Sequence, residues 1–108
     1  MPDMTPDPSI VELVGELDLH RVPAVRQQLD PLVKAKSPRL LIGLSEVSYI
    51  DSSGLALFIE TLQRVQGYGG HLALFGLRAP VRHVFDIARL DQVFKLYPDK
   101  SAALGEEG

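Results

Sequence analysis

The feature that most constrains the fold of this chain is an alternation of short apolar runs with longer amphipathic segments. The apolar runs have the length of β-strands, and the segments between them carry apolar residues every three or four positions, as helices do. The expected strands are residues 10–14, 40–44, 71–75 and 93–96. The expected helices begin near residues 22, 55, 80 and 99. This order predicts βαβ units with right-handed crossovers, and therefore a largely parallel sheet.

Prolines and glycines mark the expected ends of the helices. Pro23 suits the first turn of the first helix, where its missing N–H is not needed. Pro31 should kink or end that helix near Asp30, so we expect the first helix to be short or bent. Gly67 is expected to end the second helix, and Pro80 to open the third.

The length of 108 residues predicts a single domain. A chain of this size buries roughly two thirds of its surface on folding, which is enough for one core. Residues 1–9, which are rich in proline, and residues 105–108 are expected to be flexible tails around a domain at 10–104. The predicted fold class is α/β, with a small mixed or mostly parallel sheet of four to five strands packed against four helices.

The composition argues against several classes of function. Eleven Lys and Arg against fourteen Asp and Glu give a net charge of −3, whereas nucleic-acid binding needs a concentrated positive surface. The absence of cysteine rules out disulfides, iron–sulfur clusters and thiolate zinc sites. No apolar run approaches the ~18 residues of a membrane helix, and residues 1–8 lack the pattern of a signal peptide. We therefore expect a cytoplasmic protein that does not insert into a membrane and uses no cofactor.

The side chains that could support catalysis lack the spacing that catalysis needs. Asp18, His20 and Ser52 could be imagined as a hydrolase triad, but Ser52 lacks the G-x-S-x-G turn and Asp18 lies very close to His20 in sequence. The histidines are not spaced as metal ligands on one helix. The glycines within residues 67–70 follow an expected helix, whereas phosphate-binding loops lead from a strand into a helix. The sequence therefore favours a protein that is not an enzyme.

The most informative segment is Tyr-Ile-Asp-Ser-Ser-Gly-Leu at residues 49–55, where an apolar strand gives way to an amphipathic helix. Ser52 or Ser53 is the natural N-cap there, because its hydroxyl can accept a hydrogen bond from a free N–H of the first turn. Asp51 would lie near the positive end of the helix dipole. A second acidic loop, which ends at Asp18, precedes the first helix. From chemistry alone, the segment is either a helix cap or a binding site built on one.

Four blocks of the sequence resemble a STAS domain of the bacterial anti-sigma factor antagonist type. They are residues 15–19, 44–55, 69–74 and 80–90, in the order expected for the family. The sequence Asp-Ser-Ser-Gly at 51–54, between a strand and a helix, is the most specific of these likenesses. The resemblance implies a small sheet packed against helices, which agrees with the fold predicted from periodicity.

The resemblance also implies a function. In antagonists of this type, the serine directly after the aspartate is phosphorylated by a partner kinase, which is itself an ATP-using anti-sigma factor. That serine is Ser52 here. The unmodified antagonist binds the kinase and frees the sigma factor, and a phosphatase restores the serine. By the same matching, Ser53 is the neighbour of the acceptor, and Asp18 and Asp51 are the acidic positions beside it.

The helix that follows Ser52 is where we expect contact with a partner. Ala56 and Glu60 fall on its polar side, and Leu57, near the border, could serve as an exposed anchor. Gly54 belongs to the same predicted binding segment.

The chain departs from the family at its start, where the strand that usually precedes the Gly-Glu-Leu-Asp segment has no clear counterpart. The sheet would then be one strand short, and its uncovered edge could pair with a partner or with a second copy in a homodimer. Two other functions stay open. STAS-like proteins also serve as cytoplasmic subunits of phospholipid-transporting ABC systems, where such a subunit would bind the ATPase. A small enzyme with Ser52 as nucleophile is the other alternative.

Overall fold

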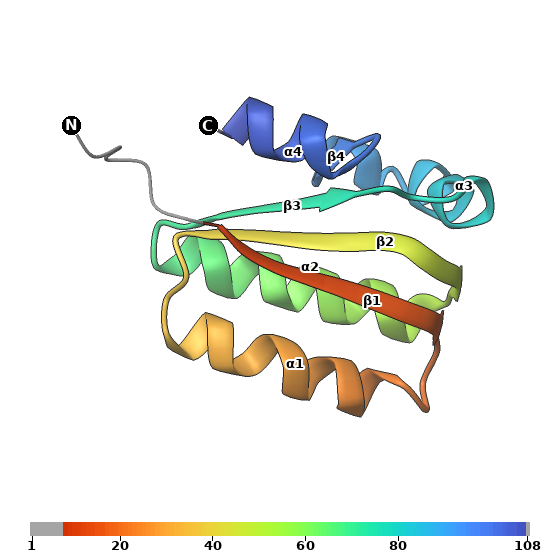
Figure 1. Ribbon diagram of the computed structural model, residues 1–108. Coiled ribbons are helices and arrows are strands. Elements are labelled where there is room, and N and C mark those ends of the chain that lie inside the picture. The colour runs from red at the N-terminus through yellow and green to blue at the C-terminus, as the bar shows by residue number, and fades with distance from the viewer. Residues whose placement is uncertain (1–7, 108) are drawn as a thin grey trace.

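A computed structural model describes residues 8–107, in which strands and helices alternate in the predicted order (Figure 1). The strands are β1 (Ser9–Leu17), β2 (Arg39–Ile50), β3 (His71–Phe75) and β4 (Lys95–Tyr97). The helices are α1 (Val22–Lys34), α2 (Ser52–Gly67), α3 (Ala79–Ile87) and α4 (Lys100–Glu107), with a 3₁₀ turn, η1, at Leu90–Gln92. The expected tails lie partly outside the described residues. In the described part of the chain, β1 begins at Ser9 and α4 continues to Glu107.

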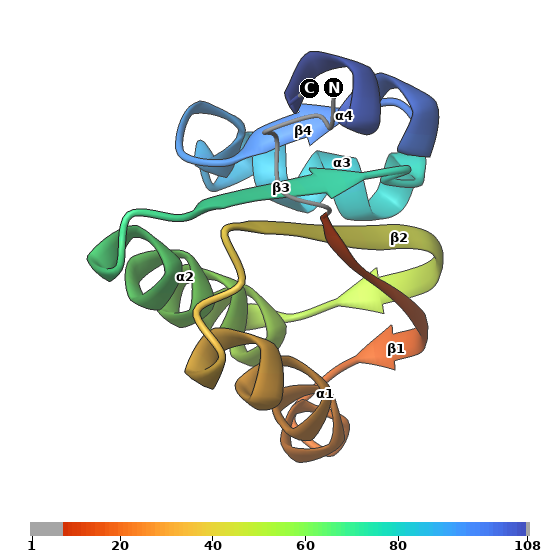
Figure 2. The same cartoon turned by 60° about the vertical axis from the view of Figure 1, so that its left-hand side comes forward.

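The sheet is entirely parallel, with the strand order β1-β2-β3-β4. This confirms the predicted α/β class with four strands and four helices in the described residues. The helices cover both faces of the sheet (Figure 2). Leu40 and Ile42 of β2 belong to a large core shared with α1, α2 and α3, whereas Leu41 belongs to a smaller cluster with Ala103 of α4. Successive residues of a strand point to opposite faces, so α4 lies on the face opposite the other three helices.

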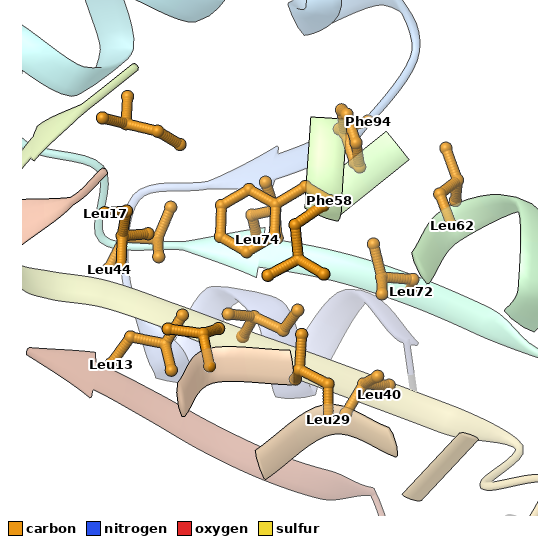
Figure 3. Close-up of a cluster of buried hydrophobic side chains, with 14 of the residues drawn as sticks. Leu13, Leu17, Leu29, Leu40, Leu44, Phe58, Leu62, Leu72, Leu74 and Phe94 are labelled. Atoms are coloured by element: carbon orange, nitrogen blue, oxygen red, sulfur yellow. The ribbon is translucent and has the colours of Figure 1, made fainter. Parts of the chain in front are cut away.

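The large core fixes which side of α2 points outward. Phe58 is fully buried and lies among leucines of β2 and β3 (Figure 3). The buried residues of α2 recur at helical spacing and are Gly54, Leu57, Phe58, Thr61, Leu62 and Val65. Burial of each large apolar side chain among them contributes roughly 1.5–3 kcal/mol. The opposite side of the helix, which begins with Ser52, is therefore held towards solvent.

The prediction that Pro31 ends the first helix near Asp30 is wrong, because α1 continues through it to Lys34. Proline removes the hydrogen bond to the carbonyl four residues earlier, which here belongs to Gln27. Pro31 and Gln27 are both exposed, so water can hydrate that carbonyl. Leu29 and Val33, on either side of the proline, are buried and hold the helix against the sheet.

The second strand is longer than predicted, and its length positions the site. The strand expected at residues 40–44 extends over Arg39–Ile50. An irregularity in the pairing with β1 falls between Gly43 and Glu46 and accommodates the polar residues there. Beyond it the two strands stay paired until both end, with Leu17 opposite Ile50. As a result, the segments that follow β1 and β2 begin side by side.

One edge of the sheet is formed by β1, which carries the Gly-Glu-Leu segment at Gly15–Leu17. In residues 8–107 no strand pairs on its outer side, so the predicted edge is present in this part of the chain. At the other edge, β4 begins at Lys95, two residues later than predicted, because the N–H groups of Val93 and Phe94 bond the carbonyl of Leu90 and continue the turn of η1.

Candidate functional site

The candidate site lies at the carboxyl ends of β1 and β2, where two loops enter α1 and α2. The N–H of Asp51 donates a hydrogen bond of 3.2 Å to the carbonyl of Leu17, which ties the end of β2 to the end of β1. Asp18 follows Leu17 directly. The two acidic residues predicted for the site therefore lie at one edge of the sheet, as the ends of neighbouring parallel strands require.

Gly54 allows these two loops to approach closely. A Cβ atom at this position would lie 2.8 Å from the carbonyl oxygen of Leu17 and 2.8 Å from Cγ1 of Ile50. Both distances are shorter than van der Waals contact, so only glycine fits without a shift of the backbone. Gly54 is buried, which corrects the expectation that it contacts a partner. Its role is to bring the start of α2 against the end of β1.

Asp51 is the N-cap of α2, which corrects the prediction that Ser52 or Ser53 takes that position. Its Oδ1 accepts hydrogen bonds from the N–H of Ser53 at 2.9 Å and of Gly54 at 3.2 Å. Its carbonyl accepts the first intrahelical bond, from Leu55, at 3.0 Å. Asp51 is the last extended residue, with φ −114° and ψ −172°, which is the backbone conformation an N-cap requires.

Because Asp51 caps the helix, the hydroxyl of Ser52 is left free. Ser52 is the first residue of α2 and is exposed. Within residues 8–107 its side chain has no hydrogen-bond partner. Ser53 is partly buried, so of the two serines Ser52 offers the more accessible hydroxyl. Ser52 is also the residue at the position that the family resemblance implies for the phosphate acceptor.

The acidic loop after β1 is fixed by its own backbone contacts. Oδ1 of Asp18 accepts hydrogen bonds of 3.0 Å from the N–H of His20 and of 3.0 Å from that of Arg21. Nη2 of Arg21 donates to the carbonyl of Val14 at 2.7 Å, beside Gly15, whose φ of +95° suits glycine. One carboxylate oxygen of Asp18 thus holds the turn, and the loop has a defined conformation at the edge of the site.

The exposed side of α2 differs in two respects from the prediction. Ala56 is exposed as expected, but Leu57 is only 3% exposed and is part of the core, so it is not an exposed anchor. Leu57 lies three residues after Gly54 and continues the buried stripe of the helix. Glu60 is partly exposed, but its carboxylate is engaged in an ion pair with Arg26 of α1.

A second ion pair joins the same two helices. Nη1 of Arg64 lies 2.7 Å from Oδ1 of Asp30. The hydrogen bond from Arg64 holds the pKa of the Asp30 carboxyl below its ordinary value of 3.8. Because Arg26 and Asp30 are four residues apart on α1, as are Glu60 and Arg64 on α2, the pairs form two successive rungs between the helices. These pairs link the helix that follows Asp18 to the helix that begins with Ser52.

Two large apolar residues next to the site were missed by the sequence analysis. Leu19 follows Asp18 in its loop and is 66% exposed. Tyr49, close to the end of β2, is 49% exposed. Their positions in the sequence could have revealed them, because both lie close to the acidic residues predicted for the site. Large apolar side chains are usually buried, and these two are exposed.

The described residues offer little that points to another chemistry. No three His, Cys, Asp or Glu side chains in residues 8–107 gather as metal ligands would. An open pocket of about 130 Å³ lies at the other end of α2, where its lining includes Leu62, Gln66 and His71. Each helix in this part of the chain is too short or too polar to cross a membrane.

The parallel sheet and the exposed serine at the start of its second crossover helix agree with the class of protein that comparison with known families gives. Residues 2–103 match the STAS domain family, and the chain belongs to that family.

The relatives within the family are more specific. The anti-sigma-B factor antagonist of Bacillus subtilis is 36% identical over 80% of this chain and 78% of its own length. The anti-sigma F factor antagonist of Paenibacillus polymyxa is 30% identical over 90% of this chain and 84% of its own. Among solved structures, an anti-sigma factor antagonist from Mycobacterium paratuberculosis matches with a TM-score of 0.85 and 27% identity, over 98% of this chain and 88% of that one.

Proposed function

We propose that this chain is a cytoplasmic anti-sigma factor antagonist that binds a serine-kinase anti-sigma factor and loses that partner when Ser52 is phosphorylated. The observation that carries the proposal is the exposed, unbonded hydroxyl of Ser52 at the start of α2. The names of the relatives from Bacillus subtilis and Paenibacillus polymyxa support the same role.

The modification is a phosphoryl transfer from ATP bound by the kinase. The Oγ of Ser52 attacks the γ-phosphorus, a new O–P bond forms, and the bond to the leaving ADP breaks. The hydroxyl proton passes to a base of the kinase or to water. A phosphatase that hydrolyses the phosphoserine would return the free hydroxyl and inorganic phosphate, and would restore binding.

The added charge explains how one modification acts as a switch. A phosphoryl group adds roughly −1.5 to −2 charges near neutral pH. Asp18 and Asp51 already make this edge of the sheet acidic. A partner surface built for a neutral hydroxyl would face a like or unpaired charge, which costs several kcal/mol. A cost of ~3–4 kcal/mol lowers affinity roughly 10² to 10³ times.

We define the acceptor surface as Asp18, Leu19, Ser52 and Ala56. Leu19 takes the place of Leu57 as the apolar anchor, because Leu19 is 66% exposed and Leu57 is 3% exposed. The neighbouring Glu60 is paired with Arg26, so we expect the partner to meet a neutral ion pair there and not a free carboxylate.

Phosphorylation is tested with the purified anti-sigma kinases of the source organism, ATP and mass spectrometry. Phosphate should appear on Ser52, should be abolished by Ser52→Ala, and should persist in Ser53→Ala. If none of these kinases places phosphate on Ser52, the proposal is rejected.

Partner binding is tested by affinity capture with Ser52→Asp, which introduces a negative charge at the acceptor. Ser101→Asp is the matched control, because Ser101 is an exposed serine in the first turn of α4, on the opposite face of the sheet. Ser52→Asp should lose the kinase while Ser101→Asp retains it. Capture of an ABC-transporter ATPase in place of the kinase would contradict the proposal and favour a transport subunit.

A further inference from the structure

The first turn of α2 is already occupied by an anion. The N–H groups in the first turn of a helix find no acceptor within the helix itself, and one of them can bond only the carbonyl of the N-cap residue. In α2, Oδ1 of Asp51 takes the N–H groups of Ser53 and Gly54, at 2.9 Å and 3.2 Å. The carbonyl of Asp51 takes that of Leu55 at 3.0 Å. Within the described residues, the backbone N–H of Ser52 is the remaining donor of this turn.

A phosphoserine at the start of a helix would ordinarily bind these same donors. Free N–H groups and the helix dipole attract an anion, and such contacts can draw a phosphate against its own helix. Here the phosphate would have to displace a carboxylate that has a favourable two-donor geometry. Two anions would compete for one set of donors, and the one already in place belongs to Asp51, which follows β2 directly and bonds Leu17 through its own N–H.

We infer that Asp51 is a positioning residue that excludes the Ser52 phosphoryl group from the N–H groups of Ser53 and Gly54 and keeps it projecting into solvent. This inference rests on the proposed phosphorylation of Ser52. The full charge of the phosphate is then presented to the partner, and the domain itself gains no new contacts from the modification. Asp51 thereby sets the strength of the switch through the phosphate, in addition to capping the helix.

Asp51→Ala should reverse this arrangement. Without the carboxylate, the N–H groups of Ser53 and Gly54 are free, and the phosphate on Ser52 becomes the nearest anion able to bind them. The unmodified variant should melt about 4–8 °C below wild type, because it lacks a cap. Phosphorylation should restore much of that loss in Asp51→Ala, whereas it should shift the melting temperature of the wild type by less than about 2 °C.

The decisive test uses the full chain with phosphoserine genetically encoded at position 52, so that no kinase is needed. Amide ¹H and ¹⁵N shifts of Ser53 and Gly54 are followed by NMR from pH 5 to pH 8, through the second ionisation of the phosphate near pH 6. In wild type these two amides should not follow that ionisation. In Asp51→Ala both should move downfield as the phosphate gains its second charge. Asp18→Ala, which removes a nearby carboxylate that does not bond α2, should behave as wild type.

Three results would overturn the inference. The first is a downfield shift of Ser53 and Gly54 with the phosphate in wild type, which would mean that the phosphate displaces Asp51. The second is a phosphorylated Asp51→Ala whose melting temperature is not restored. The third concerns Asp51→Asn, which keeps the Oδ1 acceptor and is used if Asp51→Ala does not fold. If the Ser53 and Gly54 amides of that variant follow the phosphate, the cap does not exclude the phosphate. Since the phosphoserine is encoded, none of these outcomes depends on whether a kinase modifies Ser52.

Discussion

Replacing Gly54 by alanine tests the packing that brings the two loops of the site together. Alanine favours the helical conformation over glycine by up to about 1 kcal/mol, so propensity alone predicts a more stable protein. The surroundings predict the reverse, because the added Cβ would lie 2.8 Å from the Leu17 carbonyl oxygen and 2.8 Å from Cγ1 of Ile50. The two effects have opposite signs, and their sizes decide the outcome.

The steric effect should be the larger one. Inserting a methyl group into a filled site costs about 1–3 kcal/mol, because neighbouring backbone must move. One of the atoms in the way is the carbonyl that accepts the hydrogen bond from Asp51, so a shift of Leu17 also weakens a bond worth about 0.5–1.5 kcal/mol. After the gain in helix propensity, we expect Gly54→Ala to lower the free energy of unfolding by about 1–2 kcal/mol. The melting temperature should fall by about 5–10 °C.

Gly67→Ala is the matched control, because it makes the same substitution in the same helix. Gly67 is the last residue of α2, and a Cβ there would have no atom within 4 Å. This variant should be more stable than wild type by about 0.5 kcal/mol. Both variants are compared with wild type by urea unfolding, in which a change of midpoint at constant slope reports stability.

One result of comparing Gly54→Ala with Gly67→Ala would contradict the expected steric effect. If Gly54→Ala unfolds at the same urea concentration as wild type or higher, while Gly67→Ala is stabilised, the start of α2 does not press against Leu17. The placement of Asp18 beside the acceptor serine would then be wrong as well.

Two further predictions concern the ion pairs between α1 and α2. A double-mutant cycle of Arg26→Ala and Glu60→Ala should give a coupling energy of about 0.2–1 kcal/mol that shrinks at 1 M salt. A coupling energy of zero at low salt would show that the two side chains do not interact. Arg64 lowers the pKa of Asp30, so this pair stabilises the fold fully above pH 3.8 and progressively less as pH falls below it. Asp30→Asn should therefore flatten the acid loss of stability in urea titrations, and an unchanged pH profile would contradict this.

The order of elements and the parallel sheet were predictable because apolar periodicity reports directly on burial. The errors arose where tertiary contacts override a local preference. Pro31 disfavours a helix, but the buried Leu29 and Val33 on either side of it hold α1 in place. Ser45 and Glu46 end the apolar run at residues 40–44, yet they are exposed residues beside a pairing irregularity within one longer strand. Sequence alone gives the local preference and not the packing that outweighs it.

The position of the candidate site was predictable, whereas the roles of its residues were only partly so. The step from strand to helix at Asp51 and Ser52 is visible in the sequence, but either residue type is a good cap. The choice depends on where the strand ends, which no local pattern gives. The burial of Leu57 could have been found from its place next to Phe58, at the border of the apolar stripe of the helix. The engagement of Glu60 with Arg26 could not, because it depends on how two helices pack.

The contacts that hold the site restrict the kind of switch it can form. Asp51, Gly54 and Arg21 fix both loops through hydrogen bonds and packing that do not involve the hydroxyl of Ser52. Modification of that hydroxyl therefore breaks no hydrogen bond among the described residues. No described segment depends on a phosphate to become ordered. Switches that act by ordering or melting a segment need such an element. Under the proposed function, the effect of phosphorylation must then arise at the partner's surface, from charge, while the fold of the antagonist stays the same.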